Sequence, residues 1–217
     1  MRHNPEGTFR LRWFTPTVEV DLCGHATLAA AHVIWRHDVH SIQPSLDDKI
    51  TFLTQSGPLT VTRNDKGLMT MDFPARPAQR MLPPIDVKEA LSAEPLSSWK
   101  ARDYLFEFAD EETVRNLKPD FARLVAWDTF GVIVTAPGHD VDFVSRFFAP
   151  RKGVPEDPVT GSAHCTLIPF WAERLGKKVL RARQVSRRGG ELFCEWQGDR
   201  VKIAGHAVTY MKGVIEI

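Results

Sequence analysis

The 217-residue sequence contains only three cysteines, Cys23, Cys165 and Cys194, and they lie far apart. Three scattered thiols exclude a disulfide framework and a Cys-x-x-Cys metal site. No apolar run approaches the roughly 18–20 residues that a membrane-spanning helix needs. The first residues, MRHNPEGTF, lack the apolar core of a signal peptide. We therefore expect a cytoplasmic protein that does not bind membranes.

An excess of charge of one sign is also missing, because 28 Lys and Arg residues are balanced by 27 Asp and Glu. Nucleic-acid partners require a basic face, so none is expected. Phosphate-loop and Gly-x-Ser-x-Gly motifs are absent as well. His32, His37, Asp38 and His40 lack a familiar ligand spacing, and a polar helix end and loop explains them better than a metal site. The sequence predicts no metal.

An internal repeat divides the chain. In each half, the order is Arg-aromatic-Phe-x-Pro, two acids, Gly-x-Ala, and a glycine that precedes an alternating strand. The matching segments are Arg12–Pro16, Glu19 and Asp21, Gly24–Ala26 and Gly57 in the first half, and Arg146–Pro150, Glu156 and Asp157, Gly161–Ala163 and Gly190 in the second. We predict two related halves, 1–84 and 85–217, with a last strand at about 206–217 that packs back on the first half.

The halves differ before the repeated segment. Strand-like Tyr104–Phe108 and Gly131–Thr135 flank a predicted helix at Asp110–Leu117, all ahead of Arg146, whereas few residues precede Arg12. The comparison predicts that the first half lacks an opening strand–helix–strand block.

Two predicted helices, Ala26–Trp35 and Ser162–Leu175, are apolar nearly all round, so both should be buried. Pro169 should bend or split the second, which should end at Gly176. The other predicted elements are strands at Phe9–Phe14, Ile50–Leu53, Leu59–Thr62, Leu68–Phe73, Leu192–Glu195, Arg200–Ile203 and Ala207–Tyr210, and a short helix at Asp86–Ser92. This pattern predicts an α+β fold in which each half is a curved sheet wrapped on one central helix.

The starts of these two helices are the candidate site. Asp21, Cys23, Gly24, His25 and Ala26 stand at the first, and Asp157, Thr160, Gly161 and Ser162 at the second. Glycine lets a ligand approach the backbone, and a helix start attracts anions. If the halves face each other, the two starts form one site for a small carboxylate substrate, with acid–base side chains on both sides. Alternatively, these are ordinary capped helix starts with a solvated Asp21 and a packed His25.

Arginines in Arg183–Gly190 could grip a carboxylate or could belong to a solvated strand edge. For Cys165 and Cys194, buried free thiols are the simpler interpretation.

The segments RWFTPTVEVDLCGHATLAAAHV, EDPVTGSAHCTLIPFWAERLGK and RQVSRRGGEL resemble the signature segments of the PhzF-like family of phenazine biosynthesis isomerases. The resemblance implies the diaminopimelate epimerase fold and a cofactor-independent isomerase that moves a proton on a small amino- or hydroxy-carboxylic acid. It also implies a homodimer.

By the same resemblance, His25, Asp157 and Ser162 are the catalytic residues. Gly24 and Gly161 hold the substrate carboxylate through backbone amides, and Thr160 and Ala26 adjoin the substrate. Cys23 matches the first of the two cysteines that diaminopimelate epimerases use, but Thr160 occupies the place of the second, which excludes a two-thiol mechanism.

The sequence departs from the family upstream, because the glutamate motif E-x-N-x-[ST]-E does not occur in it. We therefore expect a truncated member of the family with weak or no activity. A non-catalytic binding or interaction protein, which recruits a partner or a second copy through the incomplete half, is the main alternative. A hydrolase or metal enzyme would need a bound metal or a covalent Ser162 adduct.

Overall fold

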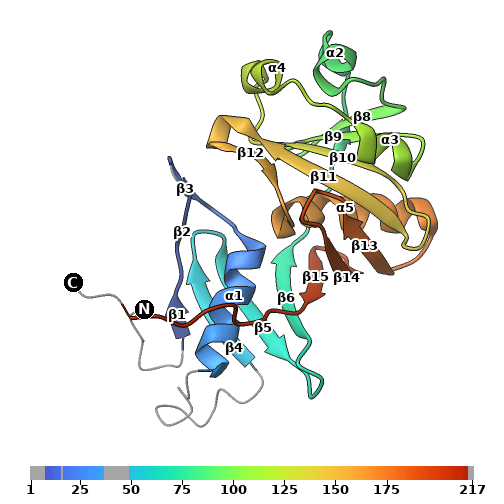
Figure 1. Cartoon of the computed structure of the whole chain (residues 1–217). Helices are drawn as coiled ribbons and strands as arrows, with labels where there is room; N and C mark the ends of the chain where they lie inside the picture. Colours follow the sequence, from blue (N-terminus) through green and yellow to red (C-terminus); the bar gives the residue numbers. More distant parts are fainter. Residues whose placement is uncertain (1–7, 16, 37–48, 215–217) are drawn as a thin grey trace.

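The computed structural model describes residues 8–15, 17–36 and 49–214, which form two α+β bodies side by side (Figure 1). The first body contains β1 (Thr8–Arg10), β2 (Trp13–Phe14), β3 (Glu19–Val20), α1 (Gly24–Arg36), β4 (Lys49–Thr54), β5 (Gly57–Arg63) and β6 (Met69–Pro74). The second contains β7 (Gln79–Arg80), α2 (Val87–Leu91), β8 (Ser97–Lys100), β9 (Tyr104–Glu107), α3 (Glu111–Asn116), α4 (Phe121–Ala126), β10 (Val132–Pro137), β11 (Phe143–Ala149), the 3-10 turn η3 (Pro150–Lys152), β12 (Val154–Asp157), α5 (Gly161–Leu175), β13 (Val179–Gln184), β14 (Gly190–Gln197) and β15 (Arg200–Gly205).

One mixed sheet runs through both bodies in the order β1-β4-β5-β6-β15-β14-β13-β11-β10-β9-β8-β7, and β12 pairs with β11 beside this path. The antiparallel pair of β6 and β15 joins the bodies, with Val201 opposite Phe73 and Ile203 opposite Met71. All four of these side chains are buried. The α+β class expected from the sequence is therefore confirmed.

The predicted strand at Phe9–Phe14 is wrong as a single element. Its first part, β1, pairs in parallel with β4, whereas its last two residues form β2, which pairs with β3 in a separate two-stranded sheet. Leu11 and Arg12 separate them, and the Leu11 N–H still reaches the Leu53 carbonyl at 3.1 Å. The bend directs β2 and β3 away from the large sheet (Figure 1).

Helix α5 is enclosed, as predicted: every residue from Gly161 to Ala172 is buried. Of the two effects expected of Pro169, a bend or a split, the split is wrong, since the helix continues through this residue. Proline has no N–H to offer the carbonyl of Cys165 one turn earlier. The Arg76 N–H, from the segment that connects the bodies, donates to that carbonyl at 2.8 Å instead.

Helix α1 is open on one side, contrary to the prediction of a fully buried helix. Leu28, Ala31 and Ile34 face the core, while Val33 on the other side is 48% exposed. Residues 206–214 cross in front of this helix (Figure 1), and Thr209 shares a 3.0 Å hydrogen bond with His32.

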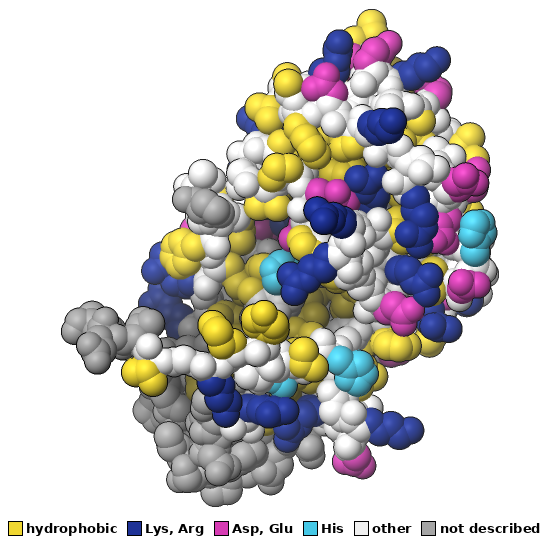
Figure 2. Space-filling view, in the orientation of Figure 1, with side chains coloured by type: hydrophobic (Ala, Val, Ile, Leu, Met, Phe, Trp, Pro, Cys, Tyr) yellow, Lys and Arg dark blue, Asp and Glu magenta, His cyan; other side chains and the backbone are white. Residues whose placement is uncertain are grey.

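The predicted strand at Ala207–Tyr210 is also wrong. Val208, Thr209 and Tyr210 are residues that favour strands, but the described part of the chain offers this segment no strand partner. Val208 and Tyr210 are 85% and 98% exposed. Figure 2 shows this segment as a ridge of hydrophobic and polar side chains across the lower part of the molecule.

Candidate active site

The starts of α1 and α5 meet at their glycines. A Cβ added to Gly24 would lie 2.9 Å from the Cα of Gly161, and the reverse distance is also 2.9 Å. Such a contact is too short for any side chain, so both positions need glycine for the two helix starts to touch. The structure thus brings together the two segments that the sequence repeat singled out.

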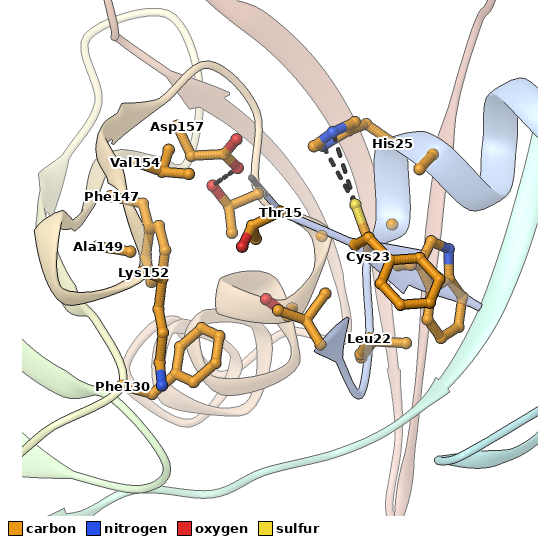
Figure 3. A pocket seen from close by; sticks show the side chains of 18 of the residues that line it. Thr15, Leu22, Cys23, His25, Phe130, Phe147, Ala149, Lys152, Val154 and Asp157 are labelled. Atoms are coloured by element: carbon orange, nitrogen blue, oxygen red, sulfur yellow. Dashed lines mark hydrogen bonds between the residues drawn. The ribbon is translucent and has the colours of Figure 1, made fainter. Parts of the chain in front are cut away.

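A pocket of about 450 Å³ opens beside this contact, within the usual size range of small-molecule sites. Figure 2 shows the hollow between the two bodies, and Figure 3 shows its lining from close by. The seven residues that the family resemblance assigns to catalysis or substrate binding all line it: Gly24, His25, Ala26, Asp157, Thr160, Gly161 and Ser162. Cys23 lines it too, whereas Asp21 does not. The geometry therefore supports one shared site rather than two unrelated helix caps.

Asp157 ends β12 and is fixed by two neighbours. The Thr160 hydroxyl donates a short hydrogen bond to its carboxylate. The buried Gln184 amide donates to the Asp157 carbonyl at 2.6 Å and accepts from the Thr160 N–H at 2.8 Å. Thr160 therefore stands at the N-cap position of α5 without capping it. Gln184 was missed as a site residue in the sequence, because only the arginines of the segment Arg183–Gly190 were considered there.

His25 faces Asp157 from α1 (Figure 3). Its Nδ1 lies 3.1 Å from the Val159 carbonyl, which can only accept, so Nδ1 donates. Its Nε2 lies 3.6 Å from the Cys23 sulfur. The hydrogen bond to Cys23, together with the nearby Asp157 charge and the Val159 carbonyl, raises the pKa of His25 to about 9 against the opposing effect of burial. At neutral pH this imidazole is protonated and acts as a hydrogen-bond donor and acid.

Ser162, in the first turn of α5, accepts a 3.0 Å hydrogen bond from the Arg102 guanidinium. A hydroxyl that is held by a cation is not activated as a nucleophile, since nucleophilic serines bond to a base. The Ser162 hydroxyl can still donate its own hydrogen to a substrate oxygen. This arrangement disfavours the hydrolase alternative.

Arg102 belongs to an ion network behind the pocket. It donates to Asp21 at 3.0 Å and to both oxygens of Asp103. Arg76 donates to the other Asp21 oxygen at 2.9 Å. Asp103 is fully buried, and burial raises its pKa while the Arg102 charge opposes that effect. Asp21 is therefore a bridge between the bodies rather than a solvated turn residue.

Much of the remaining lining of the pocket is apolar. It includes Trp13, Phe14, Leu22, Phe130 and Phe147. Lys152 also lines it, with its ammonium 5.1 Å from the centroid of the Phe130 ring. The pocket thus combines polar groups at the helix starts with aromatic and aliphatic side chains.

The remaining candidates lie elsewhere. Arg183 pairs with Glu191 at 2.8 Å on the surface and does not line the pocket. Cys165 and Cys194 are buried free thiols, as expected, and burial raises the pKa of Cys165 to about 12. Of the histidine cluster, only His32 is described; His37, Asp38 and His40 lie outside the described residues. Within the described ranges, no group of three or more His, Cys, Asp or Glu residues is arranged to hold a metal ion.

Known proteins with similar sequences show which family this chain belongs to. The family model of phenazine biosynthesis-like proteins, PhzC-PhzF, matches residues 1–213. The chain belongs to this family. A relative described as an uncharacterised isomerase, from Pseudomonas aeruginosa, is 50% identical over 210 residues, which cover 96% of this chain and 78% of the relative. The mouse phenazine biosynthesis-like domain-containing protein 1 is 40% identical over 228 residues, covering 95% of this chain and 77% of its own.

Solved structures agree with this assignment. A PhzF family protein of Enterococcus faecalis superimposes with a TM-score of 0.90 at 44% identity, over 99% of this chain and 80% of its own. A hydroxyproline epimerase of Agrobacterium vitis, solved with trans-4-hydroxy-L-proline, gives a TM-score of 0.63 at 10% identity, over 96% of this chain and 71% of its own. The latter likeness concerns the fold alone, and it confirms the epimerase-like fold expected from the sequence. Among the described residues, no helix has both the length and the apolarity to cross a bilayer.

Proposed function

We propose that this PhzF-family protein is a cofactor-independent isomerase that moves a proton on a small amino- or hydroxy-carboxylic acid. The observation that carries the proposal is the pairing of a carboxylate, Asp157, with a protonated imidazole, His25, across a pocket at two touching helix starts. The family and its relatives described as isomerases support the same class of reaction.

In the proposed mechanism, the substrate carboxylate lies against the starts of α1 and α5. The backbone N–H groups near Gly24 and Gly161 and the Ser162 hydroxyl donate to it, while Ala26 keeps the start of α1 open. Asp157 takes a proton from a carbon beside the carboxylate, and the electron pair of that C–H bond moves into an enolate. Hydrogen bonds from the helix starts and from the His25 imidazolium stabilise the enolate.

The proton then returns to a carbon from Asp157 or from His25, so that the net reaction relocates or inverts one C–H bond. Thr160 and Gln184 keep the Asp157 carboxylate aimed at the pocket throughout. No redox step or group transfer is needed.

We further propose that the chain divides functionally into halves 1–84 and 85–217, acts in the cytoplasm and forms a homodimer. Because the E-x-N-x-[ST]-E glutamate does not occur in these 217 residues, we expect slow exchange from this chain alone.

Proton exchange in heavy water tests the function. The chain is incubated in D₂O with a panel of 2-amino and 2-hydroxy acids, and deuterium in each recovered acid is measured by mass spectrometry. We expect slow but enzyme-dependent incorporation that is lost in Asp157→Asn and reduced in His25→Asn, while Asp65→Asn, an exposed turn variant, matches the wild type. Robust exchange that survives Asp157→Asn would contradict the assigned roles.

A non-catalytic binding protein on the same scaffold is the second candidate, and the exposed side of α1 favours it, because Val33 there is 48% exposed. This candidate predicts binding of small carboxylates without deuterium incorporation, and association of the chain in light scattering that a Val33→Lys substitution disrupts.

A further inference from the structure

Most of the charged side chains that line the pocket have a bonding partner in the protein, but one lysine has no carboxylate partner in the described part of the chain. Besides the Cys23 thiol, four ionisable side chains line the pocket: Arg12, His25, Lys152 and Asp157. Arg12 is bound by both oxygens of Glu19 at 2.8 Å. His25 and Asp157 are held by Cys23, Val159 and Thr160 as described above. Within the described residues, Lys152 has no carboxylate within ion-pair distance.

Lys152 is nevertheless held in place. It is the last residue of η3, it is half-buried, and its ammonium lies beside the Phe130 ring. Figure 3 shows the ammonium at the Phe130 end of the pocket, opposite Asp157 in this view. An interaction with a ring orients a lysine but leaves its charge in place.

The same ring also contacts Arg102, whose guanidinium carbon lies 4.1 Å from its centroid. The two cations differ, because the charge of Arg102 is balanced by Asp21 and Asp103. Lys152 is thus the cation of the pocket that has a fixed position and an unbalanced charge. The pocket lining also includes the large apolar side chains of Phe147 and Trp13.

We propose that Lys152 binds a second carboxylate of the substrate, so that the pocket selects small dicarboxylic acids over monocarboxylic acids. This inference rests on the proposed function, which places the first carboxylate at the helix starts. In this proposal, the carbon skeleton between the two carboxylates packs against the apolar side chains of the pocket lining. The substrate class is thereby narrowed to acids with an anionic group at each end.

Binding measurements test the inference without any turnover. Isophthalate and terephthalate are rigid diacids with an aromatic body, and their monomethyl esters have nearly the same shape with one charge fewer. Benzoate serves as the smallest monoacid. Affinity is measured by isothermal titration calorimetry, and by the change in the protein's tryptophan fluorescence, to which Trp13 in the pocket lining contributes.

We expect at least one diacid to bind about tenfold tighter than its monoester, as one charge-assisted contact of roughly 1.4 kcal/mol gives. Lys152→Met should remove this difference and leave the affinity for benzoate unchanged. Lys152→Arg should retain it, and Lys178→Met, an exposed lysine outside the pocket, should behave as the wild type.

The outcomes separate the two proposals. If monoacids bind and diacids bind no tighter, or if the difference survives Lys152→Met, the second subsite is refuted while the carboxylate pocket stands. If none of the probes binds, both proposals fail.

Discussion

Helices α1 and α5 begin with the same Gly-x-Ala pattern, touch at their first residues and occupy equivalent places in the two bodies, yet only α5 is enclosed. In α5 the first twelve residues are all buried, including the polar Ser162, His164 and Thr166. In α1 the buried residues form one face, and Val33 lies open beside the segment 206–214. Local sequence sets where such a helix starts, whereas the surrounding strands decide how much of it is buried.

The difference extends to the site. Asp157, on the α5 side, is fixed by the fully buried Gln184, whereas His25, on the α1 side, is only partly shielded from solvent and is held by Cys23 and a carbonyl. We infer that the base of the site is rigidly positioned and that its acid side can adjust to the substrate.

The largest effect is expected from cutting the link between the helix starts at Arg102. Arg102→Met leaves Asp103 buried without its counter-charge and removes a partner of Asp21 and Ser162. Breaking a buried ion pair from one side costs about 3–5 kcal/mol. Denaturant unfolding measures the loss.

Arg183→Met is the control for Arg102→Met, because it breaks an exposed pair with Glu191 and should cost no more than about 1 kcal/mol. Equal costs for the two variants would show that the buried network does not hold the bodies together.

The contrast in burial predicts a second, smaller effect. Leu167 in α5 is 0% exposed, so Leu167→Ala should cost about 3 kcal/mol through lost burial and a cavity. Val33→Ala in α1 removes a half-exposed side chain and should cost less than about 0.5 kcal/mol. Both free energies of unfolding come from the same urea titration.

If Val33→Ala were as costly as Leu167→Ala, the open side of α1 would have to be covered in solution. Comparing the costs at low and high protein concentration would then tell whether a second copy covers it.

A change of pH should affect the stabilities contributed by His164 in α5 and His25 in α1 in opposite directions. Burial lowers the pKa of His164 in α5 to about 4, whereas the pKa of His25 in α1 is raised to about 9. Between pH 6.5 and 4 the unfolded chain binds a proton at His164 that the folded chain does not, so stability falls with falling pH. The full effect is about 3 kcal/mol.

For His25 the sign is reversed, because its contribution is complete below pH 6.5 and is lost as pH rises through 9. Urea unfolding at a series of pH values measures both. His164→Asn keeps a donor for the Thr160 carbonyl, which Nδ1 approaches at 2.8 Å, and should flatten only the acid limb. An acid limb that is unchanged in His164→Asn would contradict the assignment.

Much of this arrangement could be predicted from sequence. The repeat pointed to Gly24 and Gly161 as partners, because repeated segments fold alike and related halves tend to face each other. The segments that became α1 and α5 were long and apolar, which made them safe helix predictions.

The ion network could not be predicted, because Asp21, Arg76 and Arg102 are distant in sequence and follow no period. The continuity of α5 through Pro169 depends on the Arg76 N–H, which belongs to another element. Residues Ala207–Tyr210 have a strand pattern, but a strand also needs a neighbouring edge, and no local pattern reports whether one exists.

Apart from the control variants, the smallest predicted cost concerns the point where the two helices touch. Gly24→Ala places a Cβ 2.9 Å from the backbone of Gly161, which cannot rotate away as a side chain could. The helix starts must separate slightly, at a cost of about 1–2 kcal/mol. Gly205→Ala is the matched control, since its Cβ would meet only Leu28 at an ordinary 3.8 Å. The separation should also widen the pocket between the starts, so Gly24→Ala should weaken benzoate binding while Gly205→Ala does not. A Gly24→Ala variant with unchanged stability and affinity would mean that the contact is not needed to hold the site, and that the glycine serves the ligand alone.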